Sequence, residues 1–438
     1  MPSQVASLVS DGDTVSIDAG VYPGDVAYWG KNNLLLRGVG GMAHLKSGGL
    51  SYGNKAIWVI GGNQVTVEYI EFSECTSTDK NGGGIRAEGK NLTVRHCYFH
   101  HNETGILAGS VNPSTIVIEY SEFGYNGHAN GYAHNCYINH IDTLIFRYNY
   151  VHDGVVGHEL KSRARVNYIM YNRFSNESGN ASRELDLPNG GPCLLIGNII
   201  QQGIYATNSG IIGYGLEGLS NPPPHDLYLI NNTVVNEKST GTFLHIGNST
   251  NLLKLTNNLF AGSGTFLNGT AALLDSTTNW RVNSPAAAGF VDAGNLDFHL
   301  TAVSDAIDAG TFPGTTSSGF DLTPMEEYLH PAGKITRITN GPLDIGAFEY
   351  VWPQQAGDLQ EILPVCDLLQ TGCSFQVCCA SVAVIRIRDV FGRIVGELPA
   401  GTGCRAINFS HRASGWFFAE MTYPTGRKEI RRMVAVCT

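Results

Sequence analysis

Residues 143–198 read TLIFRYNYVHDGVVGHELKSRARVNYIMYNRFSNESGNASRELDLPNGGPCLLIGN and contain one pattern three times. In each copy an alternating apolar run is followed by an asparagine, a large apolar residue two places on, and a polar turn. The asparagines are Asn149, Asn172 and Asn198, and the same phase continues to Asn232 and Asn258, at intervals of 23, 26, 34 and 26 residues. A repeat of this length is typical of one coil of a solenoid.

The residue content of each repeat indicates β-structure. Every unit holds short runs of β-branched and aromatic residues with period-two alternation, broken by Gly and Asn, and no apolar pattern at helical spacing is long enough to compete. One coil of three short strands and three turns needs roughly twenty to thirty residues. We therefore predict an all-β chain with a single-stranded parallel β-helix, in which the repeated asparagine forms a side-chain hydrogen-bond ladder at one turn.

Composition limits the partners of this chain. The 53 Gly residues and the charged fraction of 15% suit a turn-rich all-β protein. The net charge is −10 and the body of the chain has no basic cluster, so we expect no nucleic-acid partner, whereas a few local cations could still hold a polyanionic glycan. The sequence contains no run of eighteen apolar residues, so it predicts no transmembrane segment. The first residues lack the features of a signal peptide, so either the protein is not exported or the signal is missing from this numbering.

The two ends of the β-helix are predicted at residues 11–25 and about 291–350. The sequence GDTVSIDAGVY, residues 12–22, resembles the start of many secreted bacterial right-handed β-helix proteins. The sequence LDIGAFEY, residues 343–350, resembles the end of the C-terminal cap of such proteins, in which a final strand finishes the stack. We therefore expect the β-helix with its cap to occupy residues 1–350.

A second domain is predicted after a linker at residues 351–357. Residues 358–438 alternate as a small antiparallel β-sandwich would. Six cysteines fall in this region, a density that fits disulfides in an oxidised domain better than a zinc site, and they are Cys366, Cys373, Cys378, Cys379, Cys404 and Cys437. The other four, Cys75, Cys97, Cys136 and Cys193, are expected to be buried small hydrophobes of the solenoid.

The runs VIRIRDVFGRIVG and SGWFFAEM in this second domain resemble the C-terminal sorting domain of type IX secretion cargo in Bacteroidota. The resemblance implies an address and anchor without a catalytic role, the secretion machinery as a partner, and a secreted or outer cell-surface protein. The high cysteine content and Trp416 depart from that pattern. A generic sandwich that binds another molecule or caps the chain is the alternative.

One solvent face of the β-helix is predicted to collect charged and polar side chains. If Leu160, Leu185, Leu216 and Leu244 point into the core, their neighbours face outward on coils about 5 Å apart. The residues placed on or beside this face are Asn135, Tyr137, Glu159, Lys161, Arg163, Arg165, Glu184, Asp186, Glu217 and His245. His134 and His158 have the opposite parity, and we expect them to be structural.

This combination of side chains suits β-elimination on a uronic acid polymer. Such a reaction needs a cation that neutralises the substrate carboxylate and a base that removes the C5 proton. We predict Lys161 as the base, Arg163 as the carboxylate clamp, and Tyr137 as the leaving-group acid or alternative base. Glu184 and Asp186 orient the two cations or hold Ca²⁺, and the remaining residues of the face bind substrate.

The segment VGHELKSRARVNYIMYNRF, residues 156–174, with RELDLPNGG and GNIIQQG after it, resembles a large group of bacterial right-handed parallel β-helix proteins. That group is similar to polysaccharide lyases of the alginate lyase and chondroitinase B type. The resemblance implies a Lys and an Arg at work on the parallel face, often with Ca²⁺, and assigns them to Lys161 and Arg163. The acidic pair follows the lysine by one coil here, which departs from chondroitinase B and puts the calcium site in doubt.

Three alternatives to the lyase remain open from the sequence. Glu184 and Asp186 could serve a β-helix glycoside hydrolase. The protein could bind an acidic glycan without turnover. The charged face could also be a salt-bridge ladder that keeps stacked strands in register, in a structural or assembly protein. The residues alone do not identify the glycan or the oligomeric state.

Overall fold

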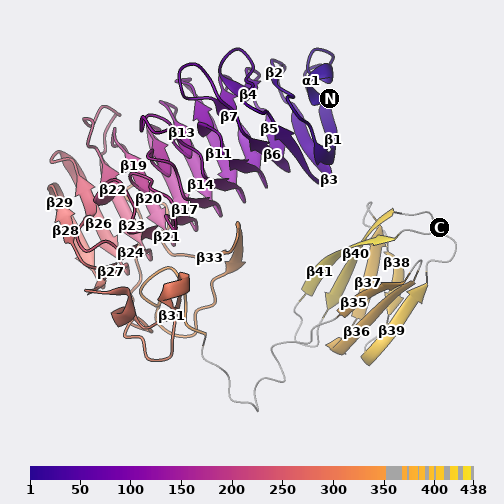
Figure 1. The fold of residues 1–438 in the computed structure, drawn as a ribbon. Helices are drawn as coiled ribbons and strands as arrows, with labels where there is room; N and C mark the ends of the chain where they lie inside the picture. Colours follow the sequence, from indigo (N-terminus) through magenta and orange to yellow (C-terminus); the bar gives the residue numbers. More distant parts are fainter. Residues whose placement is uncertain are drawn as a thin grey trace. The chain divides into compact units, whose positions relative to one another are not determined.

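The computed structural model of the chain forms two compact units, Met1–Val351 and Trp352–Thr438. It describes residues 1–351 and, after them, only the backbone of seven strands between residues 367 and 435. The first unit is a right-handed parallel β-helix, in agreement with the sequence (Figure 1).

The β-helix consists of three rows of parallel strands. The first row comprises β1 (Thr14–Val21), β3 (Leu35–Lys46), β5 (Thr66–Glu68), β8 (Thr93–Arg95), β11 (Thr115–Glu119), β14 (Thr143–Arg147), β17 (Val166–Met170), β20 (Cys193–Ile196), β23 (Asp226–Ile230), β26 (Thr250–Thr256) and β29 (Ala271–Thr277). The second row begins with the ends of β1 and β3 and continues through β6 (Ile70–Ser73), β9 (Tyr98–His100), β12 (Glu122–Gly124), β15 (Tyr150–His152), β18 (Arg173–Ser175), β21 (Ile199–Gln202), β24 (Thr233–Asn236), β27 (Leu259–Gly262) and β30 (Trp280–Val282). The third row comprises β2 (Ala27–Trp29), β4 (Ala56–Ile60), β7 (Gly83–Ala87), β10 (Thr104–Ala108), β13 (Cys136–Ile138), β16 (Leu160–Ser162), β19 (Leu185–Leu187), β22 (Gly210–Tyr214), β25 (Thr242–Ile246) and β28 (Thr265–Asn268).

Within each coil, a sharp turn separates the first and second rows. One residue there takes the left-handed conformation, as Tyr148 does with a φ of 59° between β14 and β15. Its equivalent two coils on is Gly197, with a φ of 64°, where an added Cβ would lie 2.6 Å from the ring of Tyr171. The next residue is the repeated asparagine, so the turn is built from a left-handed residue followed by Asn.

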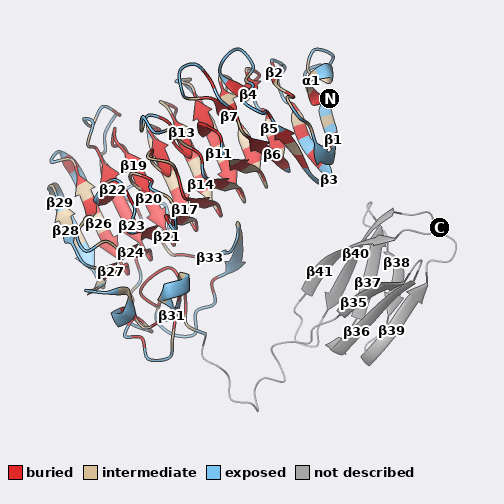
Figure 2. Cartoon of the chain, viewed as in Figure 1, coloured by how far each residue is buried: buried red, intermediate tan, exposed pale blue. Residues whose placement is uncertain are grey.

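The inward side chains form one continuous apolar core, and buried residues run along all three rows (Figure 2). Phe72, Phe99 and Phe123 stack with ring centroids 4.9 and 4.8 Å apart, because the same position of the second row is aromatic in successive coils. Leu160 and Leu185 pair in register and are fully buried, which confirms their predicted phase. The four cysteines expected in the core, Cys75, Cys97, Cys136 and Cys193, are buried and free, as predicted.

The predicted asparagine ladder is present. The backbone N–H and side-chain amide of Asn172 both donate to Asn198 Oδ1, each at 3.0 Å. Asn149 donates in the same way to Asn172, and the series continues through Asn232 and Asn258. Each asparagine also donates to a carbonyl of an earlier coil, as Asn198 does to Ile169, so the ladder ties neighbouring coils together.

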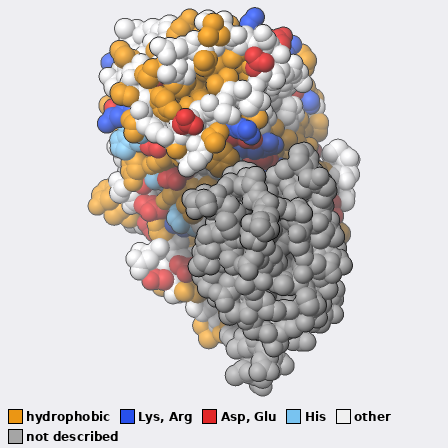
Figure 3. Space-filling view, turned by 90° about the vertical axis from the view of Figure 1, so that its right-hand side faces the viewer, with side chains coloured by type: hydrophobic (Ala, Val, Ile, Leu, Met, Phe, Trp, Pro, Cys, Tyr) orange, Lys and Arg blue, Asp and Glu red, His pale blue; other side chains and the backbone are white. Residues whose placement is uncertain are grey.

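The N-terminal end of the β-helix is covered by the helix α1 (Pro2–Val5), whose Val5 packs on the core. Figure 3 shows hydrophobic side chains on the surface at this end. Leu8, Val39 and Leu50 are among the exposed large apolar residues of the chain. The charged side chains that the view shows there are scattered and form no continuous patch.

The C-terminal segment of the first unit differs from the expectation. Residues 285–336 form η1 (Pro285–Ala288), β31 (Phe290–Asp292), η2 (Ala293–Asn295), β32 (Asp297–Leu300), β33 (Glu326–Leu329) and β34 (Gly333–Thr336). Residues 343–350 form no strand and do not finish the stack, so that prediction is wrong. Ile345 and Phe348 instead pack on the outer side of the coils, and the Ala347 N–H donates to Thr233 Oγ1. Their apolar side chains find a lateral apolar surface on Ile199 and Leu259.

The second unit consists of two antiparallel sheets, as the predicted β-sandwich requires. One sheet contains β35 (Asp367–Thr371), β36 (Ser374–Val382) and β39 (Gly401–Asn408), and the other contains β37 (Val384–Asp389), β38 (Ile394–Leu398), β40 (Gly415–Thr422) and β41 (Lys428–Ala435). The predicted linker residues 352–357 and the side chains of the six C-terminal cysteines lie outside the described part of the chain. Among the described residues, no helix combines the length and apolar character needed to cross a membrane.

Candidate functional site

The predicted face lies on the outside of the third row, where parallel pairing brings three key residues together. Tyr137 of β13 pairs in register with Lys161 of β16, and Lys161 pairs with Asp186 of β19. Successive coils place their Cα atoms about 4.8 Å apart. The Lys161 ammonium lies 3.0 Å from Asp186 Oδ2, and only 8% of the residue is exposed.

Arg163 completes this cluster from the residue after β16. Its Nε donates to the Tyr137 hydroxyl at 2.9 Å, and its guanidinium carbon lies 5.9 Å from the centre of the tyrosine ring. Its Nη1 donates to Asn189 Oδ1 at 2.7 Å. Three coils therefore converge on one cationic centre.

Glu217 binds both cations of the cluster. One of its carboxylate oxygens lies 2.6 Å from Lys161 Nζ and the other lies 2.5 Å from Arg163 Nη2. Burial opposes ionisation of this group, but the hydrogen bonds and charges of Lys161 and Arg163 prevail and lower its pKa to about 2. The side chain stays 45% exposed, so this carboxylate covers the two cations from the solvent side.

Glu217 lies in a loop and not, as was predicted, next to an inward-pointing strand residue. Leu216 was expected to point inward from a strand, but β22 ends at Tyr214 and Ile212 takes the inward position next to Leu185. Glu217 belongs to the loop after β22, and it reaches Lys161 across two coils because that loop folds back over the face.

His134 and His158 form one wall of the cluster. Their rings stack with centroids 4.9 Å apart, and His158 Nε2 lies 3.5 Å from Asp186 Oδ2. Burial and the nearby Lys161 and Arg183 lower the pKa of His158 to about 3. Burial and the neighbouring His158 likewise lower the pKa of His134. Both rings are therefore neutral at pH 7, and each accepts a backbone N–H bond.

The predicted outward orientation is wrong for Asn135, Glu159 and Glu184. All three are completely buried, because they lie in the turn before the third-row strand and their side chains point into the coil. Asn135 donates to Glu159 Oε2, and Glu159 Oε1 accepts the Gly154 N–H at 2.9 Å. Burial raises the pKa of Glu159 to about 7. It also raises the pKa of Glu184 well above its ordinary value.

The remaining predicted residues lie at the margins of this site or away from it. The carboxylate of Glu184 contacts Gln202, whereas that of Asp186 contacts Lys161, Arg183 and His158, so the two do not form the expected calcium-binding pair. His245 follows Asp186 by two rungs of the third row and contacts Asn268. Arg165 lies 3.8 Å from Asp142 and lines a different pocket.

The sequence pattern places Arg183 at the border of the predicted face, as a candidate contact to a polyanionic substrate, but it does not indicate a role for Asn189. Asn189 binds Arg163 and donates to Ser220 Oγ at 2.7 Å, so it connects the guanidinium to the loop that carries Glu217. Arg183 lies 3.6 Å from Asp186 Oδ1. Both belong to the motif RELDLPNGG, which was the available signal, but the motif alone does not say which side chains turn toward Arg163.

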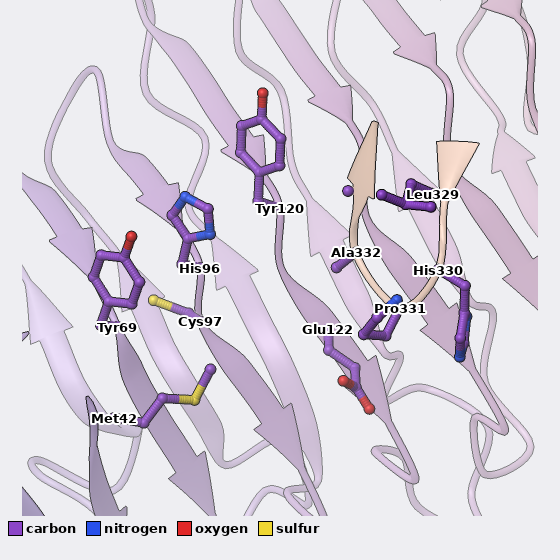
Figure 4. Close-up of a pocket in the computed structure, with 11 residues that line it drawn as sticks. Met42, Tyr69, His96, Cys97, Tyr120, Glu122, Leu329, His330, Pro331 and Ala332 are labelled. Carbon is purple, nitrogen blue, oxygen red and sulfur yellow. The ribbon is translucent and has the colours of Figure 1, made fainter. Parts of the chain in front are cut away.

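A separate pocket of about 400 Å³ lies at the turn between the first and second rows (Figure 4). Tyr69, His96 and Tyr120 form one wall, with ring centroids 4.8 and 4.9 Å apart. The connection between β33 and β34 forms the opposite wall, and Glu122 lies at the base. The stacked rings are left-handed turn residues of successive coils, so the helical repeat itself creates this aromatic wall.

Comparison with known proteins found solved structures only. No family model and no curated protein matches the chain. The crystal structure of pectate lyase Pel9A is 16% identical with a TM-score of 0.46, and the match covers 79% of this chain and 90% of that one. Geobacillus virus E2 ORF18 is 11% identical with a TM-score of 0.40, and the match covers 99% of this chain and 72% of that one. Similarity at this level carries no functional argument, so the fold assignment rests on the strand pairing described above.

Proposed function

We propose that the third-row face binds a uronic acid polymer and cleaves it by β-elimination. The observation that carries this proposal is the position of Glu217, whose carboxylate is held by Lys161 and Arg163 together. This cation pair has the geometry to grip a carboxylate, and a uronate carboxylate of a substrate would bind there by displacing Glu217. Charge-assisted bonds of this kind neutralise the carboxylate and make the neighbouring C5 proton more acidic.

The contacts of Lys161 bear on the division of roles. Its ammonium lies between Asp186 and Glu217. To act as the base, Lys161 would have to lose a proton while two carboxylates stabilise its charged form. Tyr137 Oη accepts a bond from Arg163 Nε, so a cation faces the negative charge that this oxygen would carry before it takes the proton. We therefore assign carboxylate binding to Lys161 and Arg163 and proton transfer to Tyr137, the alternative that the sequence already offered.

In the proposed reaction, the ionised Tyr137 oxygen takes the proton from C5 of the uronate. The electron pair of that C–H bond forms a C4–C5 double bond as the bond from C4 to the glycosidic oxygen breaks. The leaving oxygen then receives a proton from Tyr137, which returns to its initial state. No oxidant or second substrate is required.

Three variants of the full chain test this proposal on alginate, polygalacturonate and chondroitin sulfate. Formation of the unsaturated product is followed by the ultraviolet absorbance of its conjugated C4–C5 double bond. Tyr137→Phe removes only one oxygen and should lower kcat by roughly 10²- to 10⁴-fold while glycan binding persists. Lys161→Ala and Arg163→Lys should instead weaken binding. Lys254→Ala is the matched control, because Lys254 forms a comparable ion pair with Asp275 on the first row.

A non-catalytic glycan-binding module is the second candidate. It needs only the cation pair of Lys161 and Arg163, which already holds one carboxylate, and no group that transfers a proton. The complete internal pairing of the cluster is instead what a purely structural role predicts. The glycan-binding candidate predicts binding of an acidic glycan, lost in Lys161→Ala, with no product from any of the three polymers. Absence of both product and binding would contradict the two candidates together and leave the structural role.

Export to the cell surface is part of the proposal and rests on the sequence of the second unit. The resemblance of residues 358–438 to a sorting domain predicts that a chain without this unit stays inside the cell. Fractionation of cells that express the full and the truncated chain tests this expectation. Equal surface display of both chains would contradict it.

A further inference from the structure

A cluster of two histidines and one glutamate lies on the outside of the second row, near the N-terminal end of the β-helix. His44 of β3 pairs in register with Glu71 of β6, and His100 of β9 pairs with Ser73 of β6. One nitrogen of each imidazole and one oxygen of Glu71 lie within 4.8 Å of one another. All three residues are half-buried, so the cluster is reached from solvent.

The distances match the ligand shell of a metal ion. Glu71 Oε1 lies 3.4 Å from His44 Nδ1 and 3.0 Å from His100 Nε2. A tetrahedral ion with bonds of about 2.0 to 2.1 Å separates its ligand atoms by about 3.3 Å. Small side-chain movements would therefore bring all three atoms into a first coordination shell.

Each imidazole is oriented by a second hydrogen bond on its other nitrogen. His44 Nε2 contacts Ser73 Oγ at 2.7 Å, which leaves Nδ1 facing Glu71. His100 Nδ1 contacts His101 Nδ1 at 2.8 Å, which leaves Nε2 facing Glu71. The His100 ring also stacks on Tyr98 with centroids 4.4 Å apart. Metal-binding histidines are commonly held in this way by partners on the distal nitrogen.

The charge of Glu71 also favours a metal ion at this cluster. Within residues 1–351, the ion-pair partners of this carboxylate are His44 and His100, and no Lys or Arg lies within ion-pair distance. The carboxylates of the third-row site, in contrast, are matched by Lys161 and Arg163. The Glu71 carboxylate therefore has no lysine or arginine partner within residues 1–351, and a metal ion would supply the missing positive charge.

We propose that His44, Glu71 and His100 bind a divalent transition-metal ion of the Zn²⁺ class. Two imidazoles and one carboxylate suit Zn²⁺ and its neighbours in the first transition row better than Ca²⁺, which prefers oxygen ligands. The ion would join β3, β6 and β9. Glu122 follows Glu71 by two rungs, about 10 Å, so the ion would lie close to the aromatic pocket.

The test uses the full chain, stripped with a chelator and titrated with Co²⁺ and then Zn²⁺. We expect one equivalent of Co²⁺ with a visible spectrum of nitrogen and oxygen ligation, displaced by Zn²⁺, and a higher melting temperature with either ion. His44→Ala, Glu71→Gln and His100→Ala should each lose this equivalent. Ser73→Ala should retain the spectrum and weaken binding by about 10- to 100-fold.

His299→Ala is the matched control, because His299 contacts the carboxylate of Asp297 without a second histidine. Far-ultraviolet circular dichroism of each variant separates loss of metal from loss of fold. Cobalt bound by the C-terminal cysteines would show a sulfur charge-transfer band and would persist in all three ligand variants. A stoichiometry unchanged in those variants, or no bound Co²⁺ in the wild-type chain, would overturn the proposal. The measurement uses no glycan, so its result is independent of the lyase test.

Discussion

Each coil has two polar turns, and both turns contain asparagine side chains that hydrogen-bond to one another in successive coils. The two ladders differ in the later coils, where only one of them keeps asparagine. At the turn between the first and second rows, asparagines succeed one another through Asn258, and each amide both accepts and donates. At the turn between the second and third rows, Asn102, Asn126 and Asn135 follow the same scheme. Glu159 and Glu184 then replace the amide. A carboxyl group donates no bond when ionised and only one when protonated, whereas an amide has two donor hydrogens, so this ladder stops being self-complementary.

The consequence appears in unpaired atoms beside the candidate site. Glu184 Oε1, Gln201 Nε2 and Gln202 Oε1 are buried without a hydrogen-bond partner among the described residues. Glu159 and Glu184 each precede a site residue, Lys161 or Asp186, by two positions. The first turn thus serves stability, whereas the second carries an energetic cost next to the site. Such local costs are common where function constrains a fold.

A substitution at the centre of the first ladder should cause the greatest loss of stability. Asn198→Ala removes the acceptor of two Asn172 bonds and the donor to the Ile169 carbonyl, all in the interior. Unpaired buried groups cost about 1 to 3 kcal/mol each, so we expect a loss of about 2 to 4 kcal/mol in the free energy of unfolding. Urea denaturation measures it. A loss below about 1 kcal/mol would contradict the importance assigned to this ladder.

The second prediction concerns pH and the carboxylates of the other ladder. Burial raises the pKa of Glu184, so between pH 4.5 and its folded-state pKa the folded chain binds a proton that the unfolded chain has released. This contribution to stability is present at low pH and is lost as the pH rises. Glu184→Gln removes it, and the stability of the variant relative to wild type should rise by up to about 1.4 kcal/mol per pH unit.

The pH dependence must be measured as the difference in unfolding free energy between the wild-type chain and Glu184→Gln. The lowered pKa of His158 gives wild-type stability the opposite slope between about pH 3 and pH 6.5, so the wild-type curve alone is not diagnostic. Urea melts of both chains at pH 5 and pH 8 provide the measurement. A pH-independent difference would show that Glu184 is ionised in the fold.

The third prediction concerns Glu217, which lies on the outer side of the same coils. Glu217→Gln keeps the size of the side chain and removes the charge that occupies Lys161 and Arg163. An acidic glycan then displaces a weaker competitor, and we expect its Kd to fall by about tenfold, or about 1.4 kcal/mol. Isothermal titration at constant ionic strength measures this. Weaker binding by the variant would indicate that Glu217 contacts the glycan directly.

The smallest effect is expected at the open end of the asparagine ladder. Asn279 accepts from Asn258 as Asn198 accepts from Asn172, but it is partly exposed and water can replace it. Asn279→Ala should therefore cost less than about 1 kcal/mol. Equal costs for Asn279→Ala and Asn198→Ala would show that burial does not set the strength of this ladder.

The repeating coil could be predicted from the sequence alone. Periodic Asn residues and alternating apolar runs predicted the parallel β-helix, its asparagine ladder, the buried cysteines and the register that joins Tyr137, Lys161 and Asp186. These features follow from local rules, because side chains alternate between the two faces within a strand. The rules gave the outward direction of residues inside strands, but Lys161 and Asp186, predicted on a solvent face, are buried in the ion-pair cluster.

The directions of side chains in the turns could not be predicted from the sequence and became clear from the three-dimensional structure. Glu159 and Glu184 have the parity of Lys161 and Asp186 but lie before the strand, where alternation no longer fixes direction, and they point inward. The loop after β22 brings Glu217 back over two coils, and the LDIGAFEY segment packs sideways on an apolar surface. The cluster of His44, Glu71 and His100 likewise depends on a diagonal contact between coils. Such contacts are set by loop paths and burial, which a period-two pattern does not encode.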